Sequence, residues 1–221
     1  MRAKLLTELA GTFVFLTVIS LSGHAGQLAP LAIGLALAAM VYMGGHVSGA
    51  HYNPAVTFAL FLRGAILPPT LGLYWVTQLL AAALAFAFGY AISGQTPGIH
   101  PGSGVTAASA VGAEVLFTAA LALVVLNVAA TRETAGNSYY GLAIGLTVAA
   151  GAFAVGPISG GAFNPAVAFG ATLGAALFGH GGWSDLWIYI AGPLAGAAIG
   201  AGVHWLQAPR ANPVRPEATE R

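Results

Sequence analysis

The sequence contains no cysteine and very little charge. With no cysteine among its 221 residues, disulfide bridges and thiolate metal sites are excluded. Asp, Glu, Lys and Arg together make up only 6% of the chain, against about 25% in an average soluble domain. A chain with so little charge and a mean hydropathy of +0.81 cannot cover itself with a polar surface, so we expect its surroundings to be lipid.

Long apolar segments fill most of the chain. At about 20 residues per crossing, this length leaves room for six transmembrane helices and their connections. Six long apolar segments lie near 5–22, 31–44, 71–92, 109–130, 139–155 and 185–206, and two shorter ones, 54–62 and 165–173, begin at prolines. We interpret the first segment as a span and not a cleavable signal peptide, because it contains Glu8 and no convincing cleavage site follows it.

One group of four residues occurs twice. Asn53-Pro54-Ala55-Val56 recurs as Asn164-Pro165-Ala166-Val167, 111 positions later. At this offset residues 34–60 match 145–171 at 12 of 27 positions, and the matching residues of the first copy are Gly34, Leu35, Ala38, Ala39, Gly45, Ser48, Gly49, Asn53, Pro54, Ala55, Val56 and Phe58. A repeated helix interruption in an apolar chain is typical of a pore or transport site built by duplication.

The two Asn-Pro pairs predict helices that begin inside the membrane. Proline suits the first position of a helix, where its missing N–H has no partner anyway, and asparagine suits the cap before it. The short apolar segment after each pair would rise about 14 Å, near half of the hydrocarbon core. We expect 45–52 and 156–163 to be non-helical re-entrant loops, because such backbone is tolerated at that depth where it lines water or is wrapped in protein.

The basic residues predict the orientation of the chain. If the six segments span, all seven Lys and Arg residues share one side of the membrane: Arg2, Lys4, Arg63, Arg132, Arg210, Arg215 and Arg221. The positive-inside rule then places both termini in the cytoplasm. Three spans separate the repeats, so the second copy enters from the opposite face. We expect one channel domain over 1–208, with inverted halves of about 1–95 and 106–208, and a disordered tail over 209–221.

Two half-helices that meet at the midplane predict a passage for uncharged molecules. Each helix N-terminus carries about half a positive charge, and both would point at the same central position. Cations and protons would meet a barrier there, whereas the amides of Asn53 and Asn164 can donate hydrogen bonds to a neutral oxygen. A single Asn-Pro pair in a soluble protein would indicate only an ordinary capped helix start.

At these residues the chain resembles the aquaporin (major intrinsic protein) family. The most specific part is 45–57, Gly-His-Val-Ser-Gly-Ala-His-Tyr-Asn-Pro-Ala-Val-Thr, which is similar to the first loop of that family almost residue for residue. The resemblance implies an all-α membrane protein with six transmembrane helices and two re-entrant half-helices. It also implies a homotetramer in the cell (inner) membrane, with one pore in each protomer. We expect the bilayer and small neutral solutes as partners, and no enzyme activity, cofactor, metal or nucleic acid.

The resemblance also implies roles for individual residues. Asn53 and Asn164, with the Pro and Ala that follow each, would meet at mid-pore. A ladder of backbone carbonyls would come from Gly49, Ala50, His51, Gly160, Gly161 and Ala162, with His51 also lining the inner half of the pore. Glu8 and Glu114 would accept hydrogen bonds from the re-entrant loop of their own half. A proton relay is the alternative for these acids, but two isolated carboxyl groups do not make a chain of carriers.

The chain departs from the family at its narrow outer filter. Most members have an arginine after the second Asn-Pro-Ala, together with an aromatic residue and often a histidine. Here that position is Val167, and the other filter positions are Ile33, Ala152 and Gly161. We expect these four to set the size limit of a wide, apolar filter. Some bacterial relatives associated with arsenic detoxification are similar at this point, so we hypothesise that metalloid acids such as arsenious acid permeate.

These features together predict a passive channel for water and small uncharged solutes such as glycerol. A strict water channel is the main alternative. A secondary transporter also combines inverted repeats with broken helices, but neither loop contains a carboxylate for an ion or charged substrate. An intramembrane serine hydrolase would need Ser48 or Ser159, and neither shows the spacing of a nucleophile elbow together with a nearby histidine.

Overall fold

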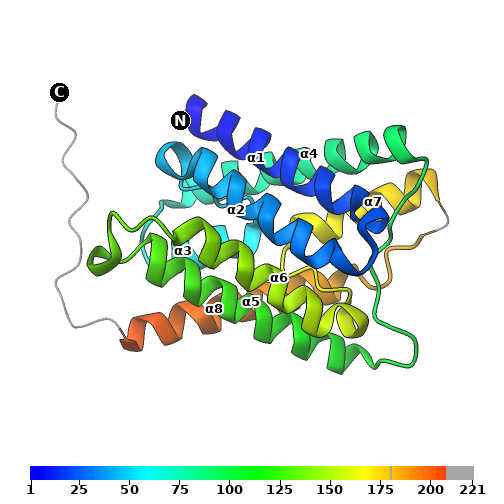
Figure 1. The fold of residues 1–221 in the computed structure, drawn as a ribbon. Coiled ribbons are helices and arrows are strands. Elements are labelled where there is room, and N and C mark those ends of the chain that lie inside the picture. Colours follow the sequence, from blue (N-terminus) through cyan, green and yellow to red (C-terminus); the bar gives the residue numbers. More distant parts are fainter. Residues whose placement is uncertain (180, 208–221) are drawn as a thin grey trace.

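The computed structural model describes residues 1–179 and 181–207, which form helices and connections without any strand (Figure 1). The helices are α1 (Arg2–Leu21), α2 (Ala29–Ser48), α3 (Pro54–Leu62), α4 (Pro68–Ser93), α5 (Ala107–Ala129), α6 (Tyr140–Ser159), α7 (Pro165–Phe178) and α8 (Leu186–Gln207), with 3-10 turns η1 (Ser22–Leu28) and η2 (Arg132–Thr134). The predicted tail, 209–221, with three of the seven basic residues, lies outside the described residues.

Six of the described helices are long and apolar enough to cross a membrane. They fall in five continuous stretches, of which the first, Arg2–Ser48, contains both α1 and α2. These two helices separate at η1, where Gly26 has a φ of 54°. The remaining two, α3 with 9 residues and α7 with 14, are too short to span. The predicted six spans and two half-helices are therefore confirmed, although α7 continues beyond the predicted end at 173.

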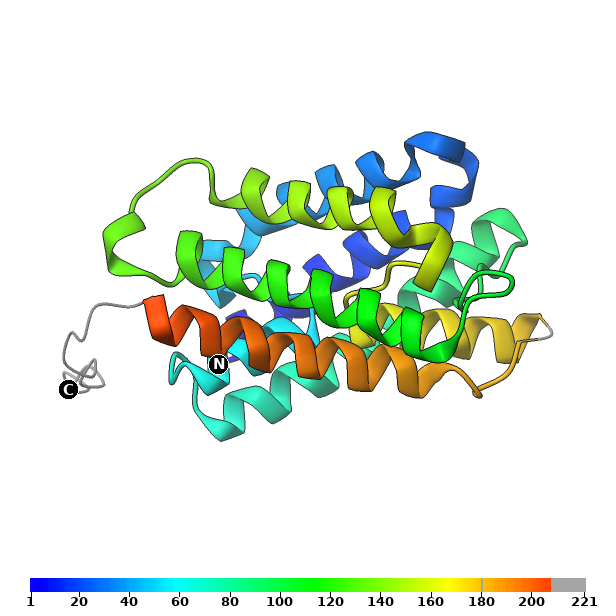
Figure 2. The same ribbon diagram turned by 90° about the horizontal axis from the view of Figure 1, so that it is seen from below.

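The two halves of the chain have the same order of elements but run in opposite directions. Figure 1 shows α1 antiparallel to α5, and α2 antiparallel to α6. The helix packing repeats as well. The contact between α1 and α4 in the first half corresponds to that between α5 and α8 in the second, and each half-helix contacts the last long helix of the other half, α3 with α8 and α7 with α4. Both views place the N-terminus, the α5–α6 connection and the end of α8 at one end of the bundle (Figure 2). The fold is thus the inverted repeat expected from the sequence.

Glycines allow the closest helix contacts. A Cβ atom on Gly34 would lie 2.5 Å from the carbonyl oxygen of its repeat partner Gly145, so α2 and α6 cross with their backbones nearly touching. On the other side of the bundle, α8 meets the backbone and side chains of α5 through Gly192, Gly196 and Gly200. Helices in lipid gain little from hydrophobic burial, and small residues let them approach closely enough for strong van der Waals contact.

The helices before the two loops extend further than predicted. Residues 45–48 and 156–159 are helical and belong to α2 and α6, so the prediction of loop there is wrong. Each helix ends at a glycine in the left-handed conformation, Gly49 with a φ of 88° and Gly160 with a φ of 89°, and the glycine N–H bonds to the carbonyl four residues earlier. This is a usual way to end a helix. Pro157 lies inside the last turn of α6, where only one hydrogen bond is lost.

Large apolar side chains cover the outside of the bundle. On α4 they recur at helical spacing and form one exposed stripe: Leu73, Val76, Leu80, Leu84, Phe88 and Ile92. A soluble monomer rarely exposes such a surface, because water would have to cover it. Together with the spanning helices, this exterior makes the chain an integral membrane protein that crosses the bilayer several times.

Candidate functional site

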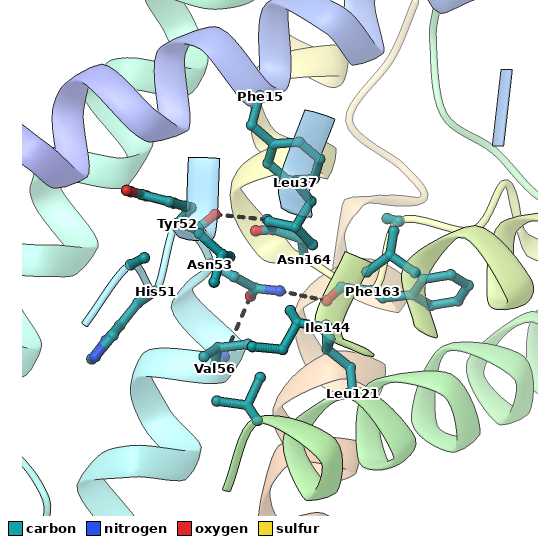
Figure 3. Close-up of a pocket in the computed structure, with 15 residues that line it drawn as sticks. Phe15, Leu37, His51, Tyr52, Asn53, Val56, Leu121, Ile144, Phe163 and Asn164 are labelled. Atoms are coloured by element: carbon teal, nitrogen blue, oxygen red, sulfur yellow. Dashed lines mark hydrogen bonds between the residues drawn. The ribbon is translucent and has the colours of Figure 1, made fainter. Parts of the chain in front are cut away.

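Asn53 and Asn164 begin the two half-helices and also bind the two loops together (Figure 3). The side-chain oxygen of each accepts the N–H two residues later, at 2.8 Å for Asn53 and 2.9 Å for Asn164, which caps α3 and α7. The amide of Asn53 donates to the carbonyl oxygen of Phe163 at 2.8 Å, and that of Asn164 to Tyr52 at 2.9 Å. Each amide has a second hydrogen, and it forms no hydrogen bond within the described ranges.

The segments 49–53 and 160–164 follow the same unusual backbone path. Residues with positive φ are Gly49, Ala50 and Tyr52 in the first segment, and their repeat partners Gly160, Gly161 and Phe163 in the second. A residue with a side chain pays about 1–2 kcal/mol for this left-handed conformation. Such backbone persists only where surrounding contacts hold it, and two buried carboxylates supply those contacts.

Glu8 of α1 holds the first segment. Its carboxylate accepts the backbone N–H groups of His51 at 2.9 Å and Tyr52 at 2.8 Å. It also accepts the Ser48 hydroxyl at 2.7 Å and the Gln78 amide at 2.9 Å. The glutamate is fully buried and all four partners are donors, which suits an ionised, acceptor-only carboxylate.

Glu114 of α5 holds the second segment in the same way, with three donors. It accepts the N–H groups of Ala162 at 3.0 Å and Phe163 at 2.7 Å, and the Ser159 hydroxyl at 2.8 Å. Within the described part of the chain no second titratable side chain is hydrogen-bonded to either glutamate. The contacts therefore favour a structural role over a proton relay. The Ser159 hydroxyl donates to the Glu114 carboxylate and its oxygen accepts the N–H of Gly161 at 3.1 Å, so both of its hydrogen-bonding groups hold the second loop, and no histidine is hydrogen-bonded to it in the described part of the chain.

Three cavities follow one another past these loops. With inner and outer named by the predicted orientation, the volume is about 450 Å³ for the inner cavity, about 20 Å³ for the central one and about 380 Å³ for the outer one. Neighbouring cavities share wall residues: Val41, Ala50, Val125 and Ile144 on the inner side, and Phe15, Val148 and Ala162 on the outer side. The three cavities therefore lie in a row, which we call the path, and the central one has room for about one water molecule.

The central cavity is apolar except near the two asparagines (Figure 3). Its apolar side chains include Phe15, Leu37, Val41, Val56, Leu121, Val125, Ile144 and Val148. His51 also lines it, with Nδ1 3.1 Å from the Thr57 hydroxyl and the ring edge-on to Tyr74 at 4.9 Å. A molecule in this space therefore finds hydrogen-bond partners only on the side of the loops.

The four residues predicted to form the filter come together at the outer cavity. Ile33 from α2, Ala152 from α6, Gly161 from the second loop and Val167 from α7 all line it. Gly160 and Ala162 line it too, whereas Gly49 lines the inner cavity and Ala50 lies between the inner and central ones. The smallest of the three cavities is the one at the asparagines, and the four predicted filter positions line the larger outer one.

Several residues that hold or line the path were not predicted from the sequence. They are Tyr74, Trp75 and Gln78 of α4, Tyr189 of α8, and His100 of the α4–α5 connection. Tyr74 and Tyr189 donate to the last carbonyls of α2 and α6 at 2.8 and 2.6 Å, and Trp75 donates to the carbonyl of the first half-helix proline at 2.9 Å. Gln78 alone carried a usable signal, because a lone amide in an apolar span indicates a polar partner.

Comparisons with known proteins agree with this geometry. The family model for the major intrinsic proteins matches residues 3–204. Probable aquaporin TIP3-2 of Arabidopsis thaliana is 38% identical over 218 residues, covering 89% of this chain and 80% of that protein. Aquaporin TIP2-3 of Zea mays is 39% identical over 171 residues, covering 76% and 67%.

A relative from the archaea and a solved structure extend the comparison. Probable aquaporin AqpM of Archaeoglobus fulgidus is 38% identical over 183 residues, covering 80% of this chain and 73% of that protein. The X-ray structure of the aquaglyceroporin from Plasmodium falciparum has the same fold, with a TM-score of 0.82 at 19% identity over 92% of this chain and 95% of that one. Because the family model covers nearly the whole chain and these relatives are so similar, this protein belongs to the major intrinsic protein family.

Proposed function

We propose that the protein is a passive channel for water and small uncharged solutes, and that the three connected cavities are its pore. The observation that carries this proposal is the central cavity, where the two asparagine amides lie on the side of the loops and the wall opposite them is apolar. A neutral oxygen can accept the free hydrogen of each amide as it passes. An ion would have to exchange its hydration shell for this wall, which offers too few ligands.

Cation exclusion is assigned to the two half-helices. α3 and α7 both begin at the central cavity, so two helix N-termini, each worth about half a positive charge, face the permeating molecule. No charged side chain lines the central or the outer cavity among the described residues. The helix dipoles are therefore the main barrier in this part of the path.

We also propose that Ile33, Ala152, Gly161 and Val167 act as a wide, apolar outer filter. An arginine would supply a fixed charge and five donors, and Val167 supplies neither. Compact neutral solutes such as glycerol or arsenious acid would then enter the outer cavity, where arsenious acid is favoured by its small size. The central cavity of about 20 Å³ supports a second candidate, a strict water channel, because solutes larger than water need this space to widen.

The remaining roles belong to the same proposal. Glu8 and Glu114 anchor the loops, and the carbonyls of 49–51 and 160–162 accept hydrogen bonds from molecules moving in single file. The exposed apolar stripe of α4 faces lipid or neighbouring protomers of a homotetramer. We place the protein in the cell membrane with both termini in the cytoplasm, as the basic residues predict.

Liposomes containing the purified protein test the function directly. Stopped-flow light scattering follows their volume after a jump in external glycerol or arsenious acid, with empty liposomes as the control. Fast shrinkage followed by fast re-swelling means that the solute enters through the protein. Fast shrinkage with re-swelling no faster than in empty liposomes identifies the strict water channel. Saturable uptake that depends on an ion gradient would instead indicate a secondary transporter.

A further inference from the structure

The connection between α4 and α5 forms part of the wall of the outer cavity. It joins the two repeats, so it has no counterpart within either one. The N–H of Gly102 donates to the carbonyl oxygen of Ile158 at 2.9 Å, which fastens the connection to the last turn of α6. A Cβ atom on Gly160 would lie only 2.9 Å from Cγ1 of Ile99, so the Ile99 side chain fills the space beside this glycine.

His100 follows Ile99 and lines the outer cavity beside the four filter positions. Among the described residues, the cavity has two polar side chains, Ser22 and His100, and the other lining side chains are apolar. In this part of the chain His100 is the one ionisable residue that lines it. His100 is exposed, and its imidazole forms no hydrogen bond within the described residues, so both ring nitrogens, a donor and an acceptor in the neutral ring, are available to a solute.

A hydroxylated solute needs such a partner more than water does. When it enters an apolar filter it exchanges hydrogen bonds to water for apolar contact, which is costly unless new partners replace them. Water is small enough to keep a hydrogen bond to the next water and to the loop carbonyls. With Val167 at the arginine position, the filter itself offers no side-chain donor.

We infer that His100 is a specificity-determining residue of the outer cavity, which hydrogen-bonds small neutral solutes bearing hydroxyl groups as they enter. The inference rests on the proposed function as a solute channel. The residue that distinguishes hydroxylated solutes by hydrogen bonding then lies in the connection between the repeats, and not among the four filter residues.

The absence of cysteine gives a direct test of position. His100→Cys introduces the only thiol, and His24→Cys is the matched control, because His24 is exposed on η1 and does not line the cavity. A bulky methanethiosulfonate reagent is expected to lower the water permeability of the His100→Cys liposomes severalfold and to leave the control unchanged, with recovery after reduction. Full labelling of His100→Cys without any loss of water flux would overturn the inference.

Two further variants separate hydrogen bonding from bulk. His100→Leu keeps most of the volume but removes both ring nitrogens, and His100→Asn keeps a donor and an acceptor. We expect the ratio of glycerol to water permeability to fall about two- to tenfold in His100→Leu, the effect of one lost hydrogen bond, and to be largely retained in His100→Asn. If the wild type passes glycerol and His100→Leu has the same ratio, only this inference fails. If the wild type passes water alone, the proposed solute function fails and the inference fails with it.

Discussion

Replacing Glu8 by glutamine tests whether the buried carboxylate holds the first loop. The change keeps the size of the side chain but turns one acceptor oxygen into an NH₂ donor. One carboxylate oxygen accepts the N–H of His51 and the Ser48 hydroxyl, and the other accepts the N–H of Tyr52 and the Gln78 amide. Whichever oxygen is replaced, one backbone N–H of the loop faces another donor and has no room to turn away.

The expected cost follows from these contacts. A hydrogen bond to a charged group contributes about 1.5–3 kcal/mol, so losing both bonds at one oxygen costs about 3–6 kcal/mol. Gln78 can reverse its amide and accept from the new NH₂, which recovers one bond when the nitrogen replaces the oxygen nearer Tyr52. We therefore expect a loss of about 3 kcal/mol. For a domain of this size that lowers the unfolding temperature by about 6–12 °C.

Thermal unfolding in detergent, followed by the fluorescence of the four tryptophans, measures this change. Stopped-flow water flux of the same preparation shows whether the loop still lines the pore. Glu133→Gln is the control, because it makes the same chemical change on an exposed turn, η2. If Glu8→Gln unfolds at the temperature of this control and conducts water normally, the carboxylate does not anchor the loop. If wild-type liposomes pass protons and Glu8→Gln liposomes do not, the relay is correct instead.

Three other substitutions test the pore and its packing. Val167→Arg adds a bulky side chain with a fixed charge, which repels a cation 4 Å away by about 4 kcal/mol at an effective dielectric constant of about 20. Solute flux and cation leak should therefore fall while water flux continues, and unchanged solute flux in liposomes would refute the filter assignment. Gly145→Leu has no space against α2 and should abolish folding as judged by size-exclusion chromatography, whereas Gly112→Leu, with nothing within 4 Å of its Cβ, should not. Asn53→Asp still caps α3 but cannot donate to the second loop, so water flux should fall; wild-type flux would mean that the bond between the loops is dispensable.

The fold is largely predictable because the bilayer fixes helix length and the cap chemistry of Asn-Pro is local. The ends of α2 and α6 were not predicted, since 45–48 and 156–159 each begin with a glycine and the second contains Pro157. Packing keeps these turns helical where local propensity alone would not. The repeated glycines at 49 and 160 were the available signal, because a glycine that follows a helix commonly ends it.

The site is only partly predictable for a related reason. Val167 and the other filter positions were located by their distance in sequence from the two Asn-Pro motifs. All four line the outer cavity. Gln78 and His100 belong to no motif. Their roles depend on how α4 packs against α1 and on how the connection after α4 folds over α6, and these arrangements exist only in three dimensions.

The hydrogen bonds from Asn53 and Asn164 to the opposite loop have a consequence for the order in which the chain is assembled. As the first half leaves the ribosome, the amide of Asn53 has no carbonyl partner, because Phe163 has not yet been made. Each half therefore remains incomplete at its innermost point until the other has entered the bilayer. An ancestor with a single repeat would have met the same constraint, and two copies in opposite orientations would have had to close the structure together before one chain joined them.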